Sequence, residues 1–202
     1  MKRLLILALL LAATAPAHAA RTILVFGDSI SAGYGIDVGR GWVALLQAKL
    51  VREGYGYRVI NASVSGETTA GGLARLPRAL ALHRPAVVIL ELGGNDGLRA
   101  LPIGEMRANL ARMVRLAKSS GAAVLLIGMR IPPNYGPGYT DEFWRSYGEL
   151  ARRARLPLVP FLLQGIALTP GSMQADGLHP NESAQPRVLA NVWPALKPLL
   201  AK

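Results

Sequence analysis

Residues 87–90 read Val87-Val88-Ile89-Leu90, and residues 124–127 read Val124-Leu125-Leu126-Ile127. Both runs are apolar at every position and do not alternate with polar residues. A strand with this pattern is buried on both faces, which is typical of a parallel β-sheet that carries helices on both sides. The two runs therefore predict the centre of a parallel sheet.

Similar short runs, bounded by Gly, Pro or Asn, occur elsewhere in the chain and complete a set of five predicted strands. These strands cover residues 22–26, 57–62, 86–92, 123–129 and 156–161. Their lengths match those of ordinary strands. We therefore expect a sheet of five strands.

Longer amphipathic segments separate the strands. Between the third and fourth, apolar residues recur at helical spacing from Met106 to Ala117, with basic residues on the opposite side, which predicts a crossover helix. The other predicted helices cover residues 42–52, 70–82, 141–154 and 182–200, and Thr140 is a candidate N-cap for the third of these. Residues 131–139 are rich in Pro and Gly, which predicts a loop over the site.

Strand and helix thus alternate five times along the chain. Right-handed crossovers place helices on both faces of such a sheet, so the fold class is α/β, a three-layer α/β/α sandwich with a five-stranded parallel sheet. Ligands of these sheets bind beyond the carboxyl ends of the strands. Functional residues are therefore expected in the segments that follow the strands.

A serine, a histidine and an aspartate in these segments have the chemistry of a nucleophilic hydrolase. Ser29 follows the first strand, and Asp176 and His179 precede the last helix. A serine needs an imidazole to take its proton and a carboxylate to orient that imidazole. The chain has no cysteine and three histidines. Because His18 lies in the leader described below and His83 lies at a predicted helix end, His179 is the candidate base.

Three groups are candidates for stabilising an oxyanion. The backbone N–H groups of Ser29 and Gly66 and the side-chain amide of Asn95 follow three successive predicted strands. Such donors stabilise the charge that develops in a tetrahedral intermediate. We expect them to share one site with Asp176 and His179.

Four sequence blocks together resemble the SGNH subgroup of the GDSL hydrolases. The blocks are Gly27-Asp28-Ser29-Ile30-Ser31, Gly66, Gly93-Gly94-Asn95-Asp96 and Asp176-Gly177-Leu178-His179-Pro180. The resemblance covers essentially the whole chain after the leader and is strongest with the branch of exported thioesterases, arylesterases and lysophospholipases. It implies a flavodoxin-like SGNH fold.

The resemblance also implies a mechanism and a set of site residues. Ser29 is the expected nucleophile, His179 the base and Asp176 the residue that orients His179, with no cofactor or metal. The expected oxyanion hole comprises Ser29, Gly66 and Asn95, and the expected substrate is a small-molecule or lipid acyl ester. The residues expected to contact substrate are Asp28, Asp96, Leu98, Pro133 and Tyr135.

The first residues have the pattern of a secretory leader. Lys2 and Arg3 precede an apolar run, and Ala17-His18-Ala19 suits a signal peptidase. We expect a signal peptide over residues 1–19, one hydrolase domain over residues 20–202, and an exported, periplasmic or secreted monomer.

The chain is strongly basic. The formal charge is +11, and loss of Lys2 and Arg3 leaves 21 basic and 12 acidic residues, a charge of +9. Such a charge favours anionic partners, including anionic lipid. No stripe of basic and aromatic residues is present, so we expect no nucleic acid partner.

Several alternatives remain open at this point. A carbohydrate O-acetyl esterase of the same family would also be exported, although no aromatic cluster marks a sugar site. A flavodoxin-like phosphate or nucleotide binder is disfavoured because Val38 replaces the third glycine of the dinucleotide pattern. A catalytically inactive binding module and a metal site that recruits Asp28 or Asp96 are further alternatives. Ser31 breaks the nucleophile-elbow pattern, which argues against the α/β-hydrolase fold.

Overall fold

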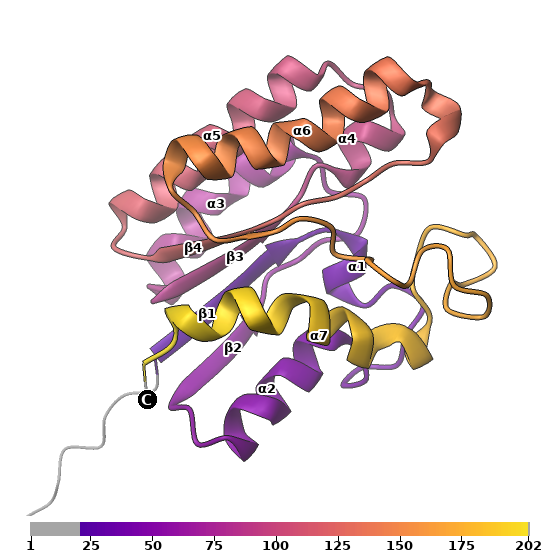
Figure 1. Cartoon of the computed structure of the whole chain (residues 1–202). Helices are drawn as coiled ribbons and strands as arrows, with labels where there is room; N and C mark the ends of the chain where they lie inside the picture. Colours follow the sequence, from indigo (N-terminus) through magenta and orange to yellow (C-terminus); the bar gives the residue numbers. More distant parts are fainter. Residues whose placement is uncertain (1–20, 202) are drawn as a thin grey trace, which may run out of the picture.

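The computed structural model describes residues 21–201 (Figure 1). Five parallel strands form one sheet in the order β2-β1-β3-β4-β5. The strands are β1 (Arg21–Gly27), β2 (Tyr57–Asn61), β3 (Val87–Glu91), β4 (Ala123–Ile127) and β5 (Leu158–Val159). From β1 the chain continues to β2 on one side of the sheet and then crosses to β3 on the other side, so a topological switch point lies between β1 and β3. The carboxyl ends of the strands at such a point form a crevice in which ligands bind.

Helices cover both faces of the sheet, as the sequence predicts. On one face α2 packs against α7, and on the other α5 packs against α3 and α6 (Figure 1). The helices are α1 (Ser29–Ala32), α2 (Trp42–Arg52), α3 (Thr69–His83), α4 (Gly94–Leu98), α5 (Ile103–Ser119), α6 (Pro137–Ala154) and α7 (Gln185–Leu196). Three short 3-10 helices are η1 (Pro133–Tyr135), η2 (Glu182–Ala184) and η3 (Lys197–Leu199).

The two central strands lie in the core. All five residues of β3 are buried, and every residue of β1 after Arg21 is buried. The continuously apolar runs are therefore strands covered on both faces, which confirms the predicted three-layer α/β/α sandwich with a five-stranded parallel sheet. Burial of these side chains removes apolar surface from water and stabilises the sheet.

Proline and glycine account for the boundaries that differ from the prediction. Helix α6 begins at Pro137, four residues before the expected start, because the first helical position needs no N–H donor. Its N-cap is Gly136 with φ 87°, so the prediction of Thr140 as N-cap is wrong. The Thr140 hydroxyl instead donates to the Gly136 carbonyl at 3.0 Å. The predicted loop over residues 131–139 is consequently shorter.

The last strand and the last helix also differ from the expected spans. Strand β5 has two residues, since Pro157 and Pro160 on either side lack an N–H to donate. The predicted helix over residues 182–200 is divided into η2, α7 and η3. The predicted leader over residues 1–19 lies outside the described residues. No helix within residues 21–201 has the length and apolar character needed to cross a membrane.

Candidate active site

The nucleophile candidate lies on a short helix that begins directly after β1. Asp28 is the N-cap of α1, and its Oδ1 accepts a hydrogen bond from the Ile30 N–H at 3.1 Å. Ser29 is the first residue of the helix and is half-buried. The helix ends at Gly33, whose φ of 79° belongs to the left-handed region that glycine adopts readily. This tight turn holds Ser29 at the carboxyl end of a central strand.

His179 and Asp176 complete a continuous line of side chains with Ser29. The His179 Nε2 lies 2.8 Å from the Ser29 Oγ, and its Nδ1 lies 2.6 Å from the Asp176 Oδ2. The other Asp176 oxygen accepts from the N–H groups of Leu178 and His179 at 2.9 and 3.0 Å. These hydrogen bonds lower the pKa of Asp176 to about 2, and the one from the His179 side chain has the largest effect. Asp176 is therefore a stable anion next to the imidazole.

The loop that carries His179 is attached to the turn after α1. The Gln174 side-chain amide donates to the Tyr34 carbonyl at 2.8 Å and to the Pro180 carbonyl at 3.2 Å. The Gln174 N–H donates to the His179 carbonyl at 2.8 Å, and the Tyr34 ring centre lies 4.7 Å from that of His179. Gln174 and Tyr34, which the sequence analysis missed, thus link two segments that are distant in the chain.

Asn95 lies on α4, across the switch point from Ser29. Its Nδ2 donates one hydrogen bond to the Asp28 Oδ2 at 3.3 Å, so its second N–H remains available. Gly93 before this helix has a φ of 112°, and a Cβ there would collide with the Tyr147 hydroxyl. Glycine is therefore required for the turn that directs Asn95 towards Ser29.

Gly66 lies in the exposed turn after β2 with a φ of 77°. Its carbonyl accepts from the Arg99 Nη2 at 3.0 Å, which connects this turn to the segment after α4. No acceptor is found within residues 21–201 for the N–H of Ser29 or of Gly66. Both donors are free to bind an oxygen of a ligand.

A second carboxyl group, Glu91, lies beneath the nucleophile and was missed by the sequence analysis. Glu91 is fully buried, and its Oε2 accepts from the Asp28 N–H at 3.2 Å and from the Ser31 hydroxyl at 2.6 Å. Its Oε1 has no partner among the described residues. In the sheet register Glu91 lies opposite Gly27, and a Cβ at Gly27 would collide with the Glu91 carboxyl group. The available signal was a charged residue at the end of an otherwise apolar central strand.

Both carboxyl groups of this buried pair have raised pKa values. Burial, and then the charge of Asp28, raise the pKa of Glu91 well above its ordinary range. Burial raises the pKa of Asp28 to about 6, a shift that the hydrogen bonds from Ile30 and Asn95 oppose. Two close carboxyl groups cannot both ionise cheaply in a low dielectric. Glu91, whose pKa the charge of Asp28 raises further, is therefore the group on which a proton is favoured, and Asp28 is the carboxyl group that accepts from Asn95.

A small apolar cavity of about 170 Å³ opens beside Ser29 and His179. A larger cavity of about 480 Å³ shares five residues with it, so the two adjoin. The shared residues are Arg130, Ile131, Pro132, Leu163 and Leu178. The Arg130 guanidinium lies 4.1 Å from the centre of the Trp144 ring in the larger cavity. Together the cavities form an apolar space that leads away from the Ser29 hydroxyl.

The expected substrate contacts are distributed unevenly around these cavities. Leu98 lines the small cavity and Pro133 the larger one. Tyr135 lies behind Leu98 and donates its hydroxyl to the Leu98 carbonyl at 2.7 Å. Asp96 is buried, with its two carboxylate oxygens bound to the N–H and the hydroxyl of Thr69 at 2.8 and 2.5 Å. Asp96 therefore anchors α4, and its expected contact with substrate stays a prediction that this burial disfavours.

Asp28 lines the small cavity next to Ser29, where it forms part of the floor and is 2 % exposed. Its two oxygens accept from the Ile30 N–H and from Asn95, within the protein. Asp28 therefore also has a positioning role beneath Ser29, and its contact with substrate stays a prediction.

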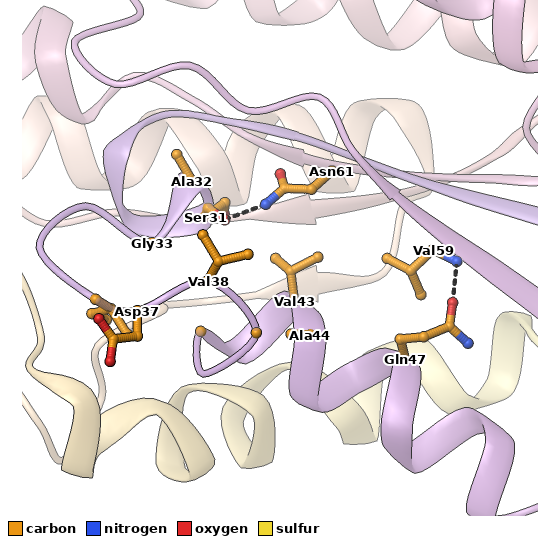
Figure 2. Close-up of a pocket in the computed structure, with 13 residues that line it drawn as sticks. Ser31, Ala32, Gly33, Asp37, Val38, Val43, Ala44, Gln47, Val59 and Asn61 are labelled. Carbon is orange, nitrogen blue, oxygen red and sulfur yellow. Dashed lines mark hydrogen bonds between the residues drawn. The ribbon is translucent and has the colours of Figure 1, made fainter.

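A further cavity of about 290 Å³, drawn in Figure 2, is lined by residues from the end of α1, from α2 and from β2. Its lining includes Ser31, Gln47 and Asn61, and it contains neither Ser29 nor His179. Asn61 donates to the Ser31 carbonyl at 2.8 Å, and Gln47 accepts from the Val59 N–H at 2.7 Å (Figure 2). These hydrogen bonds tie α1 and α2 to the edge strand β2 and support the nucleophile turn from behind.

The sequence matches a known protein family and several known proteins. The family model described as "GDSL-like Lipase/Acylhydrolase family" matches residues 25–185. The chain is 58 % identical over 182 residues to "Esterase TesA" of Pseudomonas aeruginosa, which covers 90 % of each chain. It is 42 % identical over 184 residues to "Thioesterase 1/protease 1/lysophospholipase L1" of Escherichia coli, covering 91 % of this chain and 87 % of that protein.

Solved structures agree with this relationship. The crystal structure of TesA matches with a TM-score of 0.87 at 58 % identity, over 89 % of this chain and 100 % of that chain. The family model spans most of the sequence and includes the segments that follow all five strands. The protein belongs to the GDSL-like lipase/acylhydrolase family.

Proposed function

We propose that the protein hydrolyses acyl esters and thioesters through an acyl-enzyme on Ser29. The activity class follows from the family and from relatives named esterase, arylesterase and thioesterase. The observation that carries the mechanism is the unbroken line from the Ser29 Oγ through His179 to Asp176, with 2.8 and 2.6 Å between the heavy atoms. No cofactor or metal takes part in this mechanism.

The proton moves between Ser29 and the substrate through His179. The His179 Nε2 takes the hydroxyl proton while the Ser29 Oγ attacks the carbonyl carbon, and Asp176 stabilises the imidazolium that forms. His179 then donates this proton to the departing alcohol or thiol. In the second half, His179 takes a proton from water as the water attacks the acyl carbonyl, and it returns this proton to the Ser29 Oγ as the acid departs.

The oxyanion of the tetrahedral intermediate binds between three donors. These are the N–H groups of Ser29 and Gly66 and the second N–H of the Asn95 amide, none of which has another acceptor within residues 21–201. Fixed donors stabilise the developing charge without reorganisation at the moment of reaction. Asp28 contributes indirectly, because it fixes the orientation of Asn95.

The acyl chain enters the apolar space beside Ser29. The small cavity accepts the first carbons, with Leu98 and Leu178 in its wall, and the adjoining cavity with Pro133 accepts a longer chain. Aryl esters, acyl-CoA-type thioesters and lysophospholipids share such a chain on a reactive carbonyl. A carbohydrate O-acetyl esterase would need the small cavity alone.

The catalytic site acts outside the cytoplasm in this proposal. The leader pattern of residues 1–19 supports export with cleavage after Ala19, and the mature protein is periplasmic or secreted. The positive charge favours contact with anionic lipid. N-terminal sequencing of the protein from a cell envelope fraction tests this part, and an intact Met1 on the exported protein would reject it.

The test of the activity is hydrolysis of p-nitrophenyl esters from acetyl to palmitoyl, together with palmitoyl-CoA and a lysophospholipid. We expect turnover of medium or long acyl chains, and a loss of roughly 10⁴-fold or more in Ser29→Ala. Ser119→Ala, at the exposed end of α5, is the matched control and should retain full activity. Turnover of acetyl esters alone would favour the carbohydrate esterase, and substantial residual activity in Ser29→Ala would overturn the mechanism.

A further inference from the structure

The positive charge of the chain is concentrated at the amino edge of the sheet, opposite Ser29. The strands start at this edge, and the helices that return antiparallel to them end there (Figure 1). Ten exposed cations lie at these strand starts and helix ends, and we call them the amino-edge cations. They are Arg21, Arg52, Arg58, Arg84, Arg115, Lys118, Arg152, Arg153, Arg155 and Lys197.

Most of these cations have no anionic partner. Within residues 21–201, Arg153 is the one member that lies within 4.0 Å of a carboxylate, at 3.9 Å from Glu149. Glu53 lies at the same edge, where Lys49 already binds it at 2.5 Å. The pKa of Glu53 is lowered, first by the hydrogen bond from Lys49 and further by the charges of Arg52 and Lys197. The amino edge is therefore a region of uncompensated positive charge.

Stabilisation of helix ends does not account for this asymmetry. Cations at helix C-termini complement the helix dipole, and acids at N-termini do so equally. The first turn of α5 contains Glu105, but those of α2, α3, α6 and α7 contain no acidic residue. The sequence thus places cations at one end of these helices without the matching acids at the other. A role in binding an external anion explains the difference.

The opposite edge carries charges of both signs. There Arg40 pairs with Glu182 at 2.6 Å, and Arg99 and Arg130 are exposed. Exposed carboxylates such as Asp37 and Asp141 also lie at this edge. An anionic surface would therefore attract the amino edge and leave the catalytic edge facing away from it.

We propose that the amino edge is a docking surface for an anionic phospholipid bilayer. Two large apolar side chains, Val51 and Leu82, are each 69 % exposed and lie at this edge next to the amino-edge cations. Cations bind lipid head groups, and exposed apolar side chains enter the interface between head groups and acyl chains. This mixture fits a membrane better than a nucleic acid, whose sites combine cations with stacked aromatic rings.

Docking in this orientation has a consequence for the enzyme. Ser29 and its cavities lie at the far edge, so the opening faces solution while the protein rests on the bilayer. The bound enzyme then hydrolyses acyl esters that reach it from solution. Docking itself does not require the proposed hydrolysis, which allows the two proposals to fail separately.

Co-sedimentation with large unilamellar vesicles tests the docking surface. The vesicles contain phosphatidylcholine alone or with about 30 % phosphatidylglycerol, and binding is measured at about 20 mM and about 300 mM salt. We expect binding of the exported chain to the anionic vesicles at low salt and its loss at high salt. Ser29→Ala should bind like the wild type, since it leaves the amino edge intact.

Two triple variants with the same net charge locate the surface. Arg152→Gln/Arg153→Gln/Arg155→Gln removes amino-edge cations, and Arg112→Gln/Arg145→Gln/Arg187→Gln removes exposed cations from other parts of the surface. The first should weaken vesicle binding about tenfold or more, and the second less than about threefold. Hydrolysis of p-nitrophenyl butyrate, which is soluble, should be unchanged in both.

Three outcomes would overturn the proposal. Equal loss in the two triple variants would show that net charge, and not this edge, controls binding. Absence of binding to anionic vesicles at low salt would remove the lipid partner. Binding to duplex DNA without binding to anionic vesicles would assign the edge to a nucleic acid.

Discussion

Ser29 and His179 meet in one hydrogen bond, but they belong to regions of opposite character. Beneath Ser29, Asp28 and Glu91 are 2 % and 0 % exposed and lie between central strands. Beside His179, the Asp176 side chain is 38 % exposed and is held by bonds within its own loop. The proposed nucleophile is therefore positioned by the core, whereas the proposed base is positioned by a few local hydrogen bonds and by its contact with Tyr34.

The two aspartates record this difference in their titration. Burial raises the pKa of Asp28 to about 6, while hydrogen bonds from His179 and nearby N–H groups lower the pKa of Asp176 to about 2. A buried carboxyl group loses solvation when it ionises, and an exposed one that accepts hydrogen bonds gains stability. One residue type thus serves two roles, which are assigned by the surroundings.

The largest expected effect is a loss of activity on substitution of His179, which lies on the loop with Asp176. His179→Ala removes the proposed base, which lies on a loop and outside the apolar core, so kcat/KM should fall roughly 10⁴-fold or more while the unfolding midpoint changes little. Steady-state kinetics with p-nitrophenyl butyrate and urea denaturation measure the two quantities. His83→Ala, at the end of α3, is the matched control. A large loss of stability in His179→Ala would contradict the described contrast between core and loop.

The next effect concerns the donor that Asp28 orients. Asn95→Ala should lower kcat by roughly 10²-fold with a small change in KM, because the lost hydrogen bond forms with the oxyanion and not with the ground-state carbonyl. Asn109→Ala, in the neighbouring helix α5, provides an amide control outside the site. If KM rises and kcat is unchanged, Asn95 binds substrate and is not part of the oxyanion hole.

The buried carboxyl pair predicts different results for two substitutions of one residue. Glu91→Ala leaves the Asp28 N–H and the Ser31 hydroxyl without their acceptor, at a cost of about 1–3 kcal/mol for each buried group. The turn that holds Ser29 then shifts, and kcat should fall roughly tenfold or more. Glu91→Gln keeps a neutral group of the same shape and should stay within about threefold of the wild-type kcat.

Steady-state kinetics and urea denaturation of both variants distinguish a neutral from a charged Glu91. Glu105→Ala, on the surface of α5, controls for the loss of a carboxyl group. A Glu91→Gln variant as impaired as Glu91→Ala would mean that the negative charge, and not the acceptor geometry, supports Ser29. That result would reverse the assignment of the proton within the pair.

The smallest expected effects are changes of stability with pH. These changes have opposite signs for Asp28, beneath Ser29, and for Asp176, beside His179. The native pKa of Asp28 lies above its ordinary 3.8. Its contribution to the free energy of unfolding is therefore present below pH 3.8 and is lost as the pH rises through about 6. The native pKa of Asp176 lies below 3.8, so its contribution is present above that pH and is lost as the pH falls through about 2.

Urea denaturation at several pH values separates these two contributions. Relative to wild type, Asp28→Asn should become more stable as the pH rises from about 4 to about 7, because the wild type alone must ionise a buried acid. Asp176→Asn should become less stable relative to wild type as the pH rises from about 2 to about 4. If the free energy of unfolding, relative to wild type, changed with pH in the same way in both variants, the two aspartates would share one environment.

Much of the fold could be predicted because the pattern of apolar residues depends on burial alone. The run from Val87 to Leu90 is wholly buried in β3, and helix α2 has the predicted bounds of residues 42–52. The predicted start of α6 and the predicted length of β5 were wrong. Both depend on proline, which has no N–H to donate and is therefore tolerated only where no hydrogen bond is needed. The anchoring of Asp96 by Thr69 could not be predicted, because Thr69 lies in a distant segment of the chain.

The sequence by itself determined the layer order, the edge that carries the chemistry and the identity of the single candidate base. These follow from residue types and their order, which do not change on folding. The tertiary structure alone decided which carboxyl groups are buried, in which direction their pKa values shift and which one accepts from Asn95. A carboxyl group acquires these properties from neighbours on other strands and helices, because solvation and charge act through space and not along the chain.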